Sequence, residues 1–308
     1  MKRSTKILLS VLATLALLII VALVAPLINP DLTITEKPFL RFVFVAVGLA
    51  IAYGVYLYNP KDTAWVVGTR EVVYMAIGAA LYAIFSYLFN GTVFVVPSIS
   101  QVALRPAIVI PMFFGYAFGP VVGLFTGAVG NMFADALTGF GLSPQWCIGN
   151  GLVGFIAGMH MLFESRKKAL NTVLIVGGVL TAIVTLVFFL NRGEANQLFF
   201  DVDNGIFGDQ QISIFAGLAI VIGFLIVLAV RLLVKNEKVA LAVTWAMLGN
   251  ILGIGFAALS DIAINGYTFA AAIVGEFLPA AGTNMLFAAI LLPLIVVAYE
   301  SIQKQSGR

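Results

Sequence analysis

The long apolar stretch between Arg105 and Met159 holds Asn131, Asp135 and Asn150. Asn131 and Asp135 are four residues apart, so a helix places them on one face, where an amide and a carboxylate can bind a polar ligand together. Polar side chains are costly at membrane depth and usually mark a pocket or an internal pathway. This spacing therefore predicts a site that binds or moves a polar solute.

A second group contains polar and aromatic residues. Trp146 lies just before Asn150, and Asn250, Glu276 and Asn284 follow in the last third of the chain. If the helices alternate across a membrane, most of these side chains meet in its outer half, where an importer first holds its solute. We therefore predict that they share one site with the first group. The structural alternative is that the Asn residues cap or bridge helices and that the Trp is an interfacial anchor.

The composition argues against an enzyme. The chain has one cysteine, Cys147, and one histidine, His160, so neither an internal disulfide nor a cluster of Cys or His metal ligands can form. No nucleotide-binding loop is present, and the scattered carboxylates do not supply a nucleophile with a matching base. We expect no catalytic residues, no metal site and no cofactor in this chain, with ATP used only by partner subunits.

Hydropathy determines the expected fold class. Hydrophobic residues make up 61% of the 308 residues and charged residues only 10%, whereas a typical soluble domain has about 25% charged residues. Because a helix of about 20 apolar residues crosses a bilayer, the pattern predicts an all-α, polytopic helical membrane protein with about ten transmembrane helices. The predicted spans are residues 7–28, 39–58, 71–89, 104–118, 120–138, 146–163, 170–190, 212–234, 240–262 and 270–299.

Lys and Arg residues indicate the orientation of these helices. If the N-terminus is inside, most of the 17 basic residues fall on the side that holds both termini, including the cluster at residues 166–168. Cytoplasmic loops carry such an excess of Lys and Arg. We therefore predict a multi-pass protein of the plasma membrane with both termini in the cytoplasm. The first span is longer than a signal-peptide core and is interpreted as a retained helix.

The third predicted span carries small residues at helical spacing. Ala76 and Ala80 are four residues apart, as are Ala79 and Ala83. Small residues let helices approach closely within a membrane. The functional interpretation is a docking surface for another membrane protein, and the structural interpretation is close packing within this chain.

The order of these features resembles the S component, the substrate-capture subunit, of energy-coupling factor (ECF) transporters. The resemblance is carried by the alanine-rich helix, by RPAIVIPMFFGYAFGPVVGLFTGAVGNMFADAL, by QWCIGNGLVGFIAGM with the basic ESRKK after it, and by the last two helices with the loop between them. It covers roughly residues 70–165 and 240–300.

This resemblance implies that the chain captures a vitamin or similar micronutrient from outside and then docks onto a membrane coupling protein driven by two cytoplasmic ATPase subunits. It also implies that the alanines of the first core helix contact the coupling protein. The pocket is expected, on the same grounds, to contain Trp146, Asn150, Asn250, Glu276 and Asn284.

S components usually have six helices, so the additional spans predict a division of the chain. Two N-terminal transmembrane helices occupy residues 1–69, and the first part of an S-component-like core occupies residues 70–165. An inserted transmembrane hairpin follows at 166–238, and the last part of the core with a cytoplasmic tail occupies 239–308.

Two other functions remain open from the residues alone. One is a stand-alone secondary transporter driven by protons or sodium, in which Asp135 and Glu276 couple ion and solute movement. The other is a membrane sensor or an intramembrane enzyme. The acidic residues favour a cationic or hydrogen-bond-rich solute, such as a thiamine-like compound or its pyrimidine precursor, and the aromatic residues equally allow riboflavin.

Overall fold

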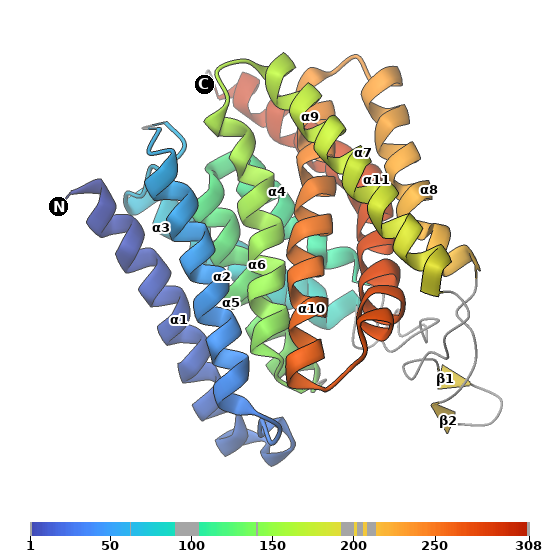
Figure 1. The fold of residues 1–308 in the computed structure, drawn as a ribbon. Coiled ribbons are helices and arrows are strands. Elements are labelled where there is room, and N and C mark those ends of the chain that lie inside the picture. Colours follow the sequence, from blue (N-terminus) through green and yellow to red (C-terminus); the bar gives the residue numbers. More distant parts are fainter. Residues whose placement is uncertain are drawn as a thin grey trace.

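The chain forms a bundle of helices that run roughly side by side (Figure 1). The computed structural model describes residues 2–61, 63–89, 105–139, 141–191, 200–201, 206–207 and 214–306. Apart from helices, these residues contain one short antiparallel pair, in which β1 (Phe200–Asp201) lies beside β2 (Ile206–Phe207). The predicted all-α, polytopic architecture is confirmed.

The helices follow the predicted spans in order. They are α1 (Arg3–Ile28), α2 (Pro38–Tyr58), α3 (Thr69–Ser86), α4 (Val109–Phe118), α5 (Pro120–Thr138), α6 (Pro144–Gly158), α7 (Arg166–Asn191), α8 (Ile214–Leu233), α9 (Glu237–Gly249), α10 (Gly255–Ile264) and α11 (Leu278–Gln305). Three short 3₁₀ helices are η1 (Pro30–Leu32), η3 (Pro106–Ile108) and η4 (Met159–Leu162). Two π-helical segments, η5 (Asn250–Ile254) and η6 (Ala271–Phe277), join α9 to α10 and lead into α11.

Each of the ten predicted spans contains a helix. Among the described residues, seven helices are long and apolar enough to cross a membrane, and Pro106–Phe118 and Leu218–Leu233 are shorter apolar helices. The fourth and fifth spans are separate helices that meet at Gly119, whose φ of 107° favours glycine. A sharp turn therefore replaces a continuous helix at this point.

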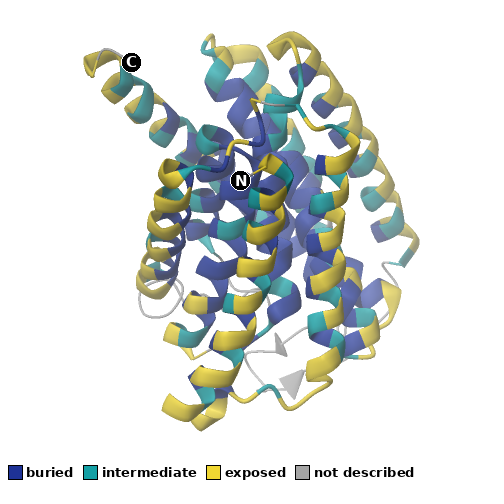
Figure 2. Cartoon of the chain, turned by 90° about the vertical axis from the view of Figure 1, so that its left-hand side faces the viewer, coloured by how far each residue is buried: buried dark blue, intermediate teal, exposed yellow. Residues whose placement is uncertain are grey.

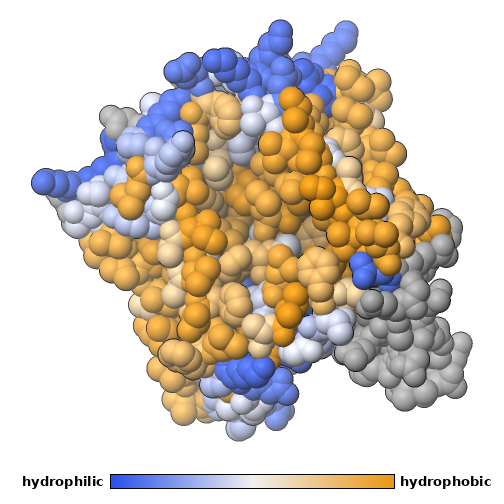
Figure 3. All heavy atoms as spheres, in the orientation of Figure 1, coloured by the Kyte–Doolittle hydropathy of each residue, from blue (hydrophilic) through white to orange (hydrophobic). Residues whose placement is uncertain are grey.

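The surface has the character of a protein that lies in lipid. A broad hydrophobic band covers the middle of the face in Figure 3, and hydrophilic residues gather at its two ends. Many residues on the outer helices α1, α2 and α3 are exposed, whereas the interior of the bundle is buried (Figure 2). Large side chains such as Leu23, Val72 and Ile77 are among the exposed hydrophobic ones. Such an apolar surface is stable only when lipid or another protein covers it.

Glycines allow α5 and α6 to pack with their backbones in contact. A Cβ atom added to Gly123 would overlap the carbonyl oxygen of Gly154, and one added to Gly127 would overlap the carbonyl oxygen of Asn150. Close approach of this kind is typical of membrane helices with small residues at the interface. Because Asn150 belongs to the predicted site, this packing also fixes the position of the site's backbone.

Both termini lie towards the same end of the bundle, which is the upper end in Figure 1. The connections from α1 to α2, from α5 to α6 and from α10 to η6 lie at the opposite end. The peripheral helices α7 and α8 pack against each other and against α9 and α11. This arrangement leaves α5, α6, α10 and η6 to surround a common space at the end opposite to the termini.

Candidate functional site

A cavity of about 270 Å³ lies where α5 ends, α6 begins and the chain turns from α10 into η6. Five of the seven predicted binding residues line it: Asp135, Trp146, Asn150, Glu276 and Asn284. They come from α5, α6, η6 and α11, so residues far apart in sequence converge as expected. Helices supply most of this lining, and the segments that connect them supply the rest.

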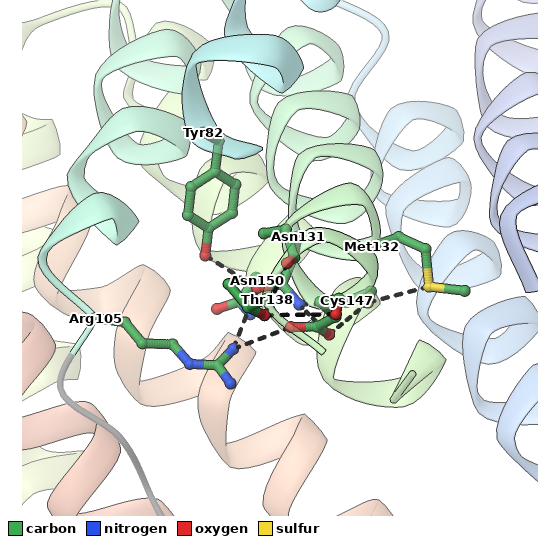
Figure 4. Close-up of polar contacts among 9 residues, drawn as sticks. Tyr82, Arg105, Asn131, Met132, Thr138, Cys147 and Asn150 are labelled. Atoms are coloured by element: carbon green, nitrogen blue, oxygen red, sulfur yellow. Dashed lines mark hydrogen bonds and ion pairs between the residues drawn. The ribbon is translucent and has the colours of Figure 1, made fainter. Parts of the chain in front are cut away.

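Asp135 lines the cavity and belongs to a hydrogen-bonded network. Figure 4 labels other members of this network, Tyr82, Arg105, Asn131 and Asn150. Asn131 Nδ2 donates to Asp135 Oδ2 at 2.9 Å, as the spacing of four residues on α5 predicts. Asn131 itself does not line the cavity, and its Oδ1 accepts from Asn150 Nδ2 at 2.9 Å. The hydroxyl of Tyr82, on α3, donates to the same oxygen at 3.2 Å. The network therefore ties three helices together.

Arg105 provides the charge partner of Asp135. Its Nη1 atom is 3.7 Å from Asp135 Oδ1 and 3.4 Å from Asn131 Oδ1. The Asp135 side chain is 6% exposed and that of Arg105 is 28% exposed. An ion pair in such surroundings is stable only with good partners on both sides. This wall of the cavity is thus electrically balanced and rich in hydrogen bonds.

Asp261 also lines the cavity and was not among the predicted binding residues. Its Oδ1 accepts from Gln145 Nε2 at 3.0 Å, and its Oδ2 accepts from Trp146 Nε1 at 2.7 Å. Both donors are neutral. Trp146 therefore orients a carboxylate of the cavity, a role beyond that of a lipid anchor. The sequence signal was present, since an indole N–H and a carboxylate near a membrane interface each require a partner.

Glu276 differs from both aspartates because its carboxylate is not fully satisfied. It lies on η6, where it is 8% exposed, and it stands against the Asp261 carboxyl group. Its Oε2 atom is buried without a hydrogen-bond partner. A buried, unpaired oxygen of a charged group is energetically costly. Segments of π-helix are frequent at functional sites, and this one holds the Glu276 side chain at the cavity wall.

Arg41, Asn265 and Tyr267 add to the polar lining. Arg41, near the start of α2, donates from Nη2 to Asn265 Oδ1 at 3.3 Å. Tyr267 lies in the turn between α10 and η6, where burial and the nearby Glu276 carboxylate raise the pKa of its hydroxyl to about 12. Its hydroxyl therefore keeps its proton and can donate a hydrogen bond. The contribution of Arg41 shows that the N-terminal helix pair takes part in the cavity.

Asn250 does not line the cavity, contrary to the prediction. It is fully buried in η5, where its Nδ2 donates to the carbonyl oxygen of Ala246 at 2.9 Å. An amide four residues along a helix can bond the preceding turn in this way. Its helical neighbour Ile254 lines the cavity instead. Sequence spacing alone could not say which face of the α9–α10 segment points inwards.

The predicted docking alanines lie on two different faces of α3. Ala76 and Ala80 are exposed, but Ala79 and Ala83 are each 5% exposed because α3 packs against α5 on that side. The prediction of one surface made of four alanines is corrected to an outer pair and an inner pair. The inner pair serves close packing within the chain, and the outer pair remains available to a partner or to lipid.

Among the described residues, no group of three or more His, Cys, Asp or Glu side chains could hold a metal ion. The cavity chemistry visible in this part of the chain is therefore that of hydrogen bonds, carboxylates, guanidinium groups and aromatic rings. Such a lining suits the reversible binding of a small polar molecule.

The comparisons with known proteins point to one family. Residues 66–191 match the family model described as ECF-type riboflavin transporter, S component. The match runs from the segment before α3 to the end of α7, so it includes the Asp135 wall of the cavity and ends before η6. It also includes α7, which the sequence interpretation placed in an inserted hairpin.

Curated relatives match a shorter part of the chain. The UPF0397 protein of Aliivibrio salmonicida is 34% identical over 98 residues, which are 32% of this chain and 51% of that protein. The UPF0397 protein of Vibrio atlanticus is 34% identical over 98 residues and 52% of its length, and that of Aliivibrio fischeri is 33% identical over 51% of its length. The chain spans about half the length of these curated relatives.

No solved structure was found to match the chain. The family assignment therefore depends on the sequence match over α3 to α7, together with the multi-pass helical fold. Both agree with the order of the alanine-rich helix and the two glycine-rich helices that first suggested the resemblance. Residues 66–191 of this membrane protein are similar in sequence to the S components of ECF-type riboflavin transporters.

Proposed function

We propose that the chain is the substrate-capture subunit of an ECF-type, ATP-driven importer and that it binds a water-soluble vitamin or related micronutrient. The observation that carries this proposal is the 270 Å³ cavity, in which the buried Glu276 Oε2 atom has no partner from the chain. The family match of residues 66–191 supports a role in transport. A solute that donates a hydrogen bond to Glu276 Oε2 would supply the partner that this buried atom lacks in the chain.

The size and lining of the cavity fit a small solute. Its volume of about 270 Å³ is near the lower end of the roughly 300–1,000 Å³ that small-molecule sites usually have. Carboxylates, guanidinium groups and amides line it, with Trp146 and Tyr267 as flat apolar walls. A compact heterocycle that both donates and accepts hydrogen bonds fits this combination best.

The proposed orientation places this cavity on the outer side of the plasma membrane. Both termini, and the connection of α6 to α7 with its basic cluster, lie at the end opposite to the cavity. The excess of Lys and Arg at that end supports a cytoplasmic location for it. Solute would then enter from outside, and both termini would remain in the cytoplasm.

Partner subunits supply the energy in this proposal. We expect a membrane coupling protein and two cytoplasmic ATPases, and we assign the exposed pair Ala76 and Ala80 on α3 to the contact with the coupling protein. A surface of small residues allows close approach of another helix. The cavity core would then combine residues 70–165 with 239–308, and the helix pair of residues 1–69 contributes Arg41.

Purification and mass spectrometry test the binding function. Protein purified in mild detergent is expected to release one small solute on denaturation, and re-addition of that solute should raise the unfolding temperature. Reconstituted vesicles then separate the two transport models. Uptake that depends on co-expressed ATPases supports the proposal, whereas uptake by this chain alone with an ion gradient would favour the secondary transporter. Failure to retain or bind any solute contradicts both.

Replacement of Ala80 by Trp tests the docking surface. The indole ring would prevent close helix approach at an exposed position, so Ala80→Trp should abolish ATP-dependent uptake and leave solute affinity unchanged. Ala50→Trp is the matched control, because Ala50 is exposed on α2. Equal uptake by the two variants would remove the docking role of Ala80.

A further inference from the structure

We propose that the cavity recognises a positively charged group of its solute, held between the carboxylates of Asp261 and Glu276. This inference rests on the proposed function and adds the substrate class, an organic monocation. It begins from the distribution of charge around the cavity. Three carboxylates and two guanidinium groups line it: Asp135, Asp261, Glu276, Arg41 and Arg105.

The two arginines are already engaged. Arg105 pairs with Asp135 at 3.7 Å, so this couple is balanced without a ligand. Arg41 donates from Nε to the carbonyl oxygen of Glu36 at 2.9 Å and from Nη2 to Asn265 Oδ1 at 3.3 Å. Neither arginine has an ion pair with Asp261 or Glu276 within 4 Å in the described structure. Arg41 acts on the Asp261 carboxylate only from beyond 4 Å. The carboxylate pair therefore has no direct counterion, and of the three carboxylates and two guanidinium groups around the cavity one negative charge is left unbalanced.

Neutral donors do not replace a counterion. Asp261 receives hydrogen bonds from Gln145 and Trp146, and these offset the loss of water around its oxygens but add no positive charge. Glu276 stands against it with Oε2 buried and unpartnered. Two adjacent carboxylates in a buried site repel each other unless a cation or a proton lies between them. With 8% of Glu276 exposed, bulk water is a poor substitute.

The surroundings favour an organic cation over a metal ion. Ca²⁺ typically takes 6–8 oxygen ligands, and among the described residues no group of three or more His, Cys, Asp or Glu side chains could hold a metal ion. In contrast, Trp146 and Tyr267 line the same cavity, and aromatic rings stabilise organic cations by cation–π interaction. A protonated or quaternary nitrogen on a small flat ring satisfies the two carboxylates and the aromatic walls together.

Matched probes test this inference on the unmodified protein. 1-Methylnicotinamide and nicotinamide have nearly the same shape, but only the first carries a fixed positive charge. Isothermal titration of the full-length protein in lipid nanodiscs should show that the cation binds about 30-fold more tightly, since the attraction between its fixed charge and the buried carboxylates contributes about 2 kcal/mol. Thiamine, a larger cation, and riboflavin, which is neutral, extend the comparison to vitamins.

Variants locate the selectivity. Glu276→Gln should reduce the preference for the cation to about threefold, because the amide keeps the shape but not the charge. Asp261→Asn is a second variant with the same expected result. Asp31→Asn is the control, because Asp31 is an exposed carboxylate of η1 that does not line the cavity. The unfolding temperature without ligand shows whether each variant is folded.

The possible outcomes distinguish failure of the proposed cation selectivity from failure of the proposed capture function. Selectivity for the cation that disappears in both cavity variants, and persists in Asp31→Asn, supports the inference. The inference is overturned if nicotinamide or riboflavin binds as tightly as the cation or more tightly, and if Glu276→Gln does not change this. That result would indicate that the two carboxylates share a proton, and the capture function would still stand. Absence of binding by every probe, with no solute retained after purification, overturns the capture function as well.

Discussion

Asp135 and Glu276 are both buried carboxylates at the wall of one cavity, and they differ in what surrounds them. Asp135 accepts from Asn131 and faces Arg105, and Asn131 itself accepts hydrogen bonds from α3 and α6. Glu276 faces another carboxylate and leaves Oε2 without a partner. One wall is therefore complete without a ligand, and the other is not.

This difference separates a group that holds the fold from a group that awaits a ligand. A satisfied polar network rigidifies the helices that contribute to it. An unsatisfied carboxylate lowers the stability of the empty protein, and a ligand that satisfies it recovers that free energy as binding. Substitutions on the Asp135 wall should thus change stability, and substitutions on the Glu276 wall should change affinity.

The largest effect on stability is expected from Arg105→Gln. It leaves the Asp135 carboxylate, 6% exposed, without its charge partner, and breaking a buried pair in this way costs about 3 kcal/mol. The unfolding temperature of the unliganded protein in detergent should fall clearly. Glu276→Gln, in contrast, should leave that temperature unchanged or raise it, because a neutral amide is less costly beside Asp261.

Arg166→Gln is the control for this prediction. Arg166 Nη1 is 3.9 Å from Glu237 Oε2, but the two side chains are 56% and 66% exposed, and exposed ion pairs contribute little because water and salt screen them. It should unfold as the parent does. The comparison between the two walls fails if Arg105→Gln is as stable as the parent while Glu276→Gln is destabilised.

The sequence predicted the helices well because a single physical requirement dominates them. Within a bilayer the backbone must be satisfied by helical hydrogen bonds, so apolar segments such as residues 170–190 leave few alternatives. The i, i+4 spacing of Asn131 and Asp135 likewise predicted a direct contact, and the structure shows it at 2.9 Å. Contacts between residues on one helix are the part of the site that a sequence predicts most directly, because they depend only on local spacing.

Contacts between distant segments were harder to predict. Asp261 binds Gln145 and Trp146 across 116 and 115 residues, and no local pattern specifies that pairing. The burial of Ala79 and the position of Asn250 away from the cavity depend on how α3 and η5 are rotated in the bundle. Rotation of a helix that is hydrophobic on all sides leaves only a weak trace in its sequence.

The smallest effect is expected from Tyr82→Phe, which tests how the Asp135 wall is built. The Tyr82 hydroxyl is one of three donors to Asn131 Oδ1, together with Asn150 Nδ2 at 2.9 Å and Arg105 Nη1 at 3.4 Å. Its removal leaves the acceptor satisfied and strands no charge. The expected loss is about 1 kcal/mol, that of an ordinary neutral hydrogen bond.

Solute affinity should change less than about threefold in Tyr82→Phe, because its hydrogen bond lies on the wall that is complete without a ligand. Tyr58→Phe is the matched control, since Tyr58 is 93% exposed. Both unfolding temperature and affinity should be measured, because a change on the Asp135 wall should alter mainly stability and a change on the Glu276 wall should alter mainly affinity. A tenfold loss of affinity with little loss of stability would mean that α3, through Tyr82, acts on the solute site itself, and the division between a structural wall and a binding wall would then be wrong.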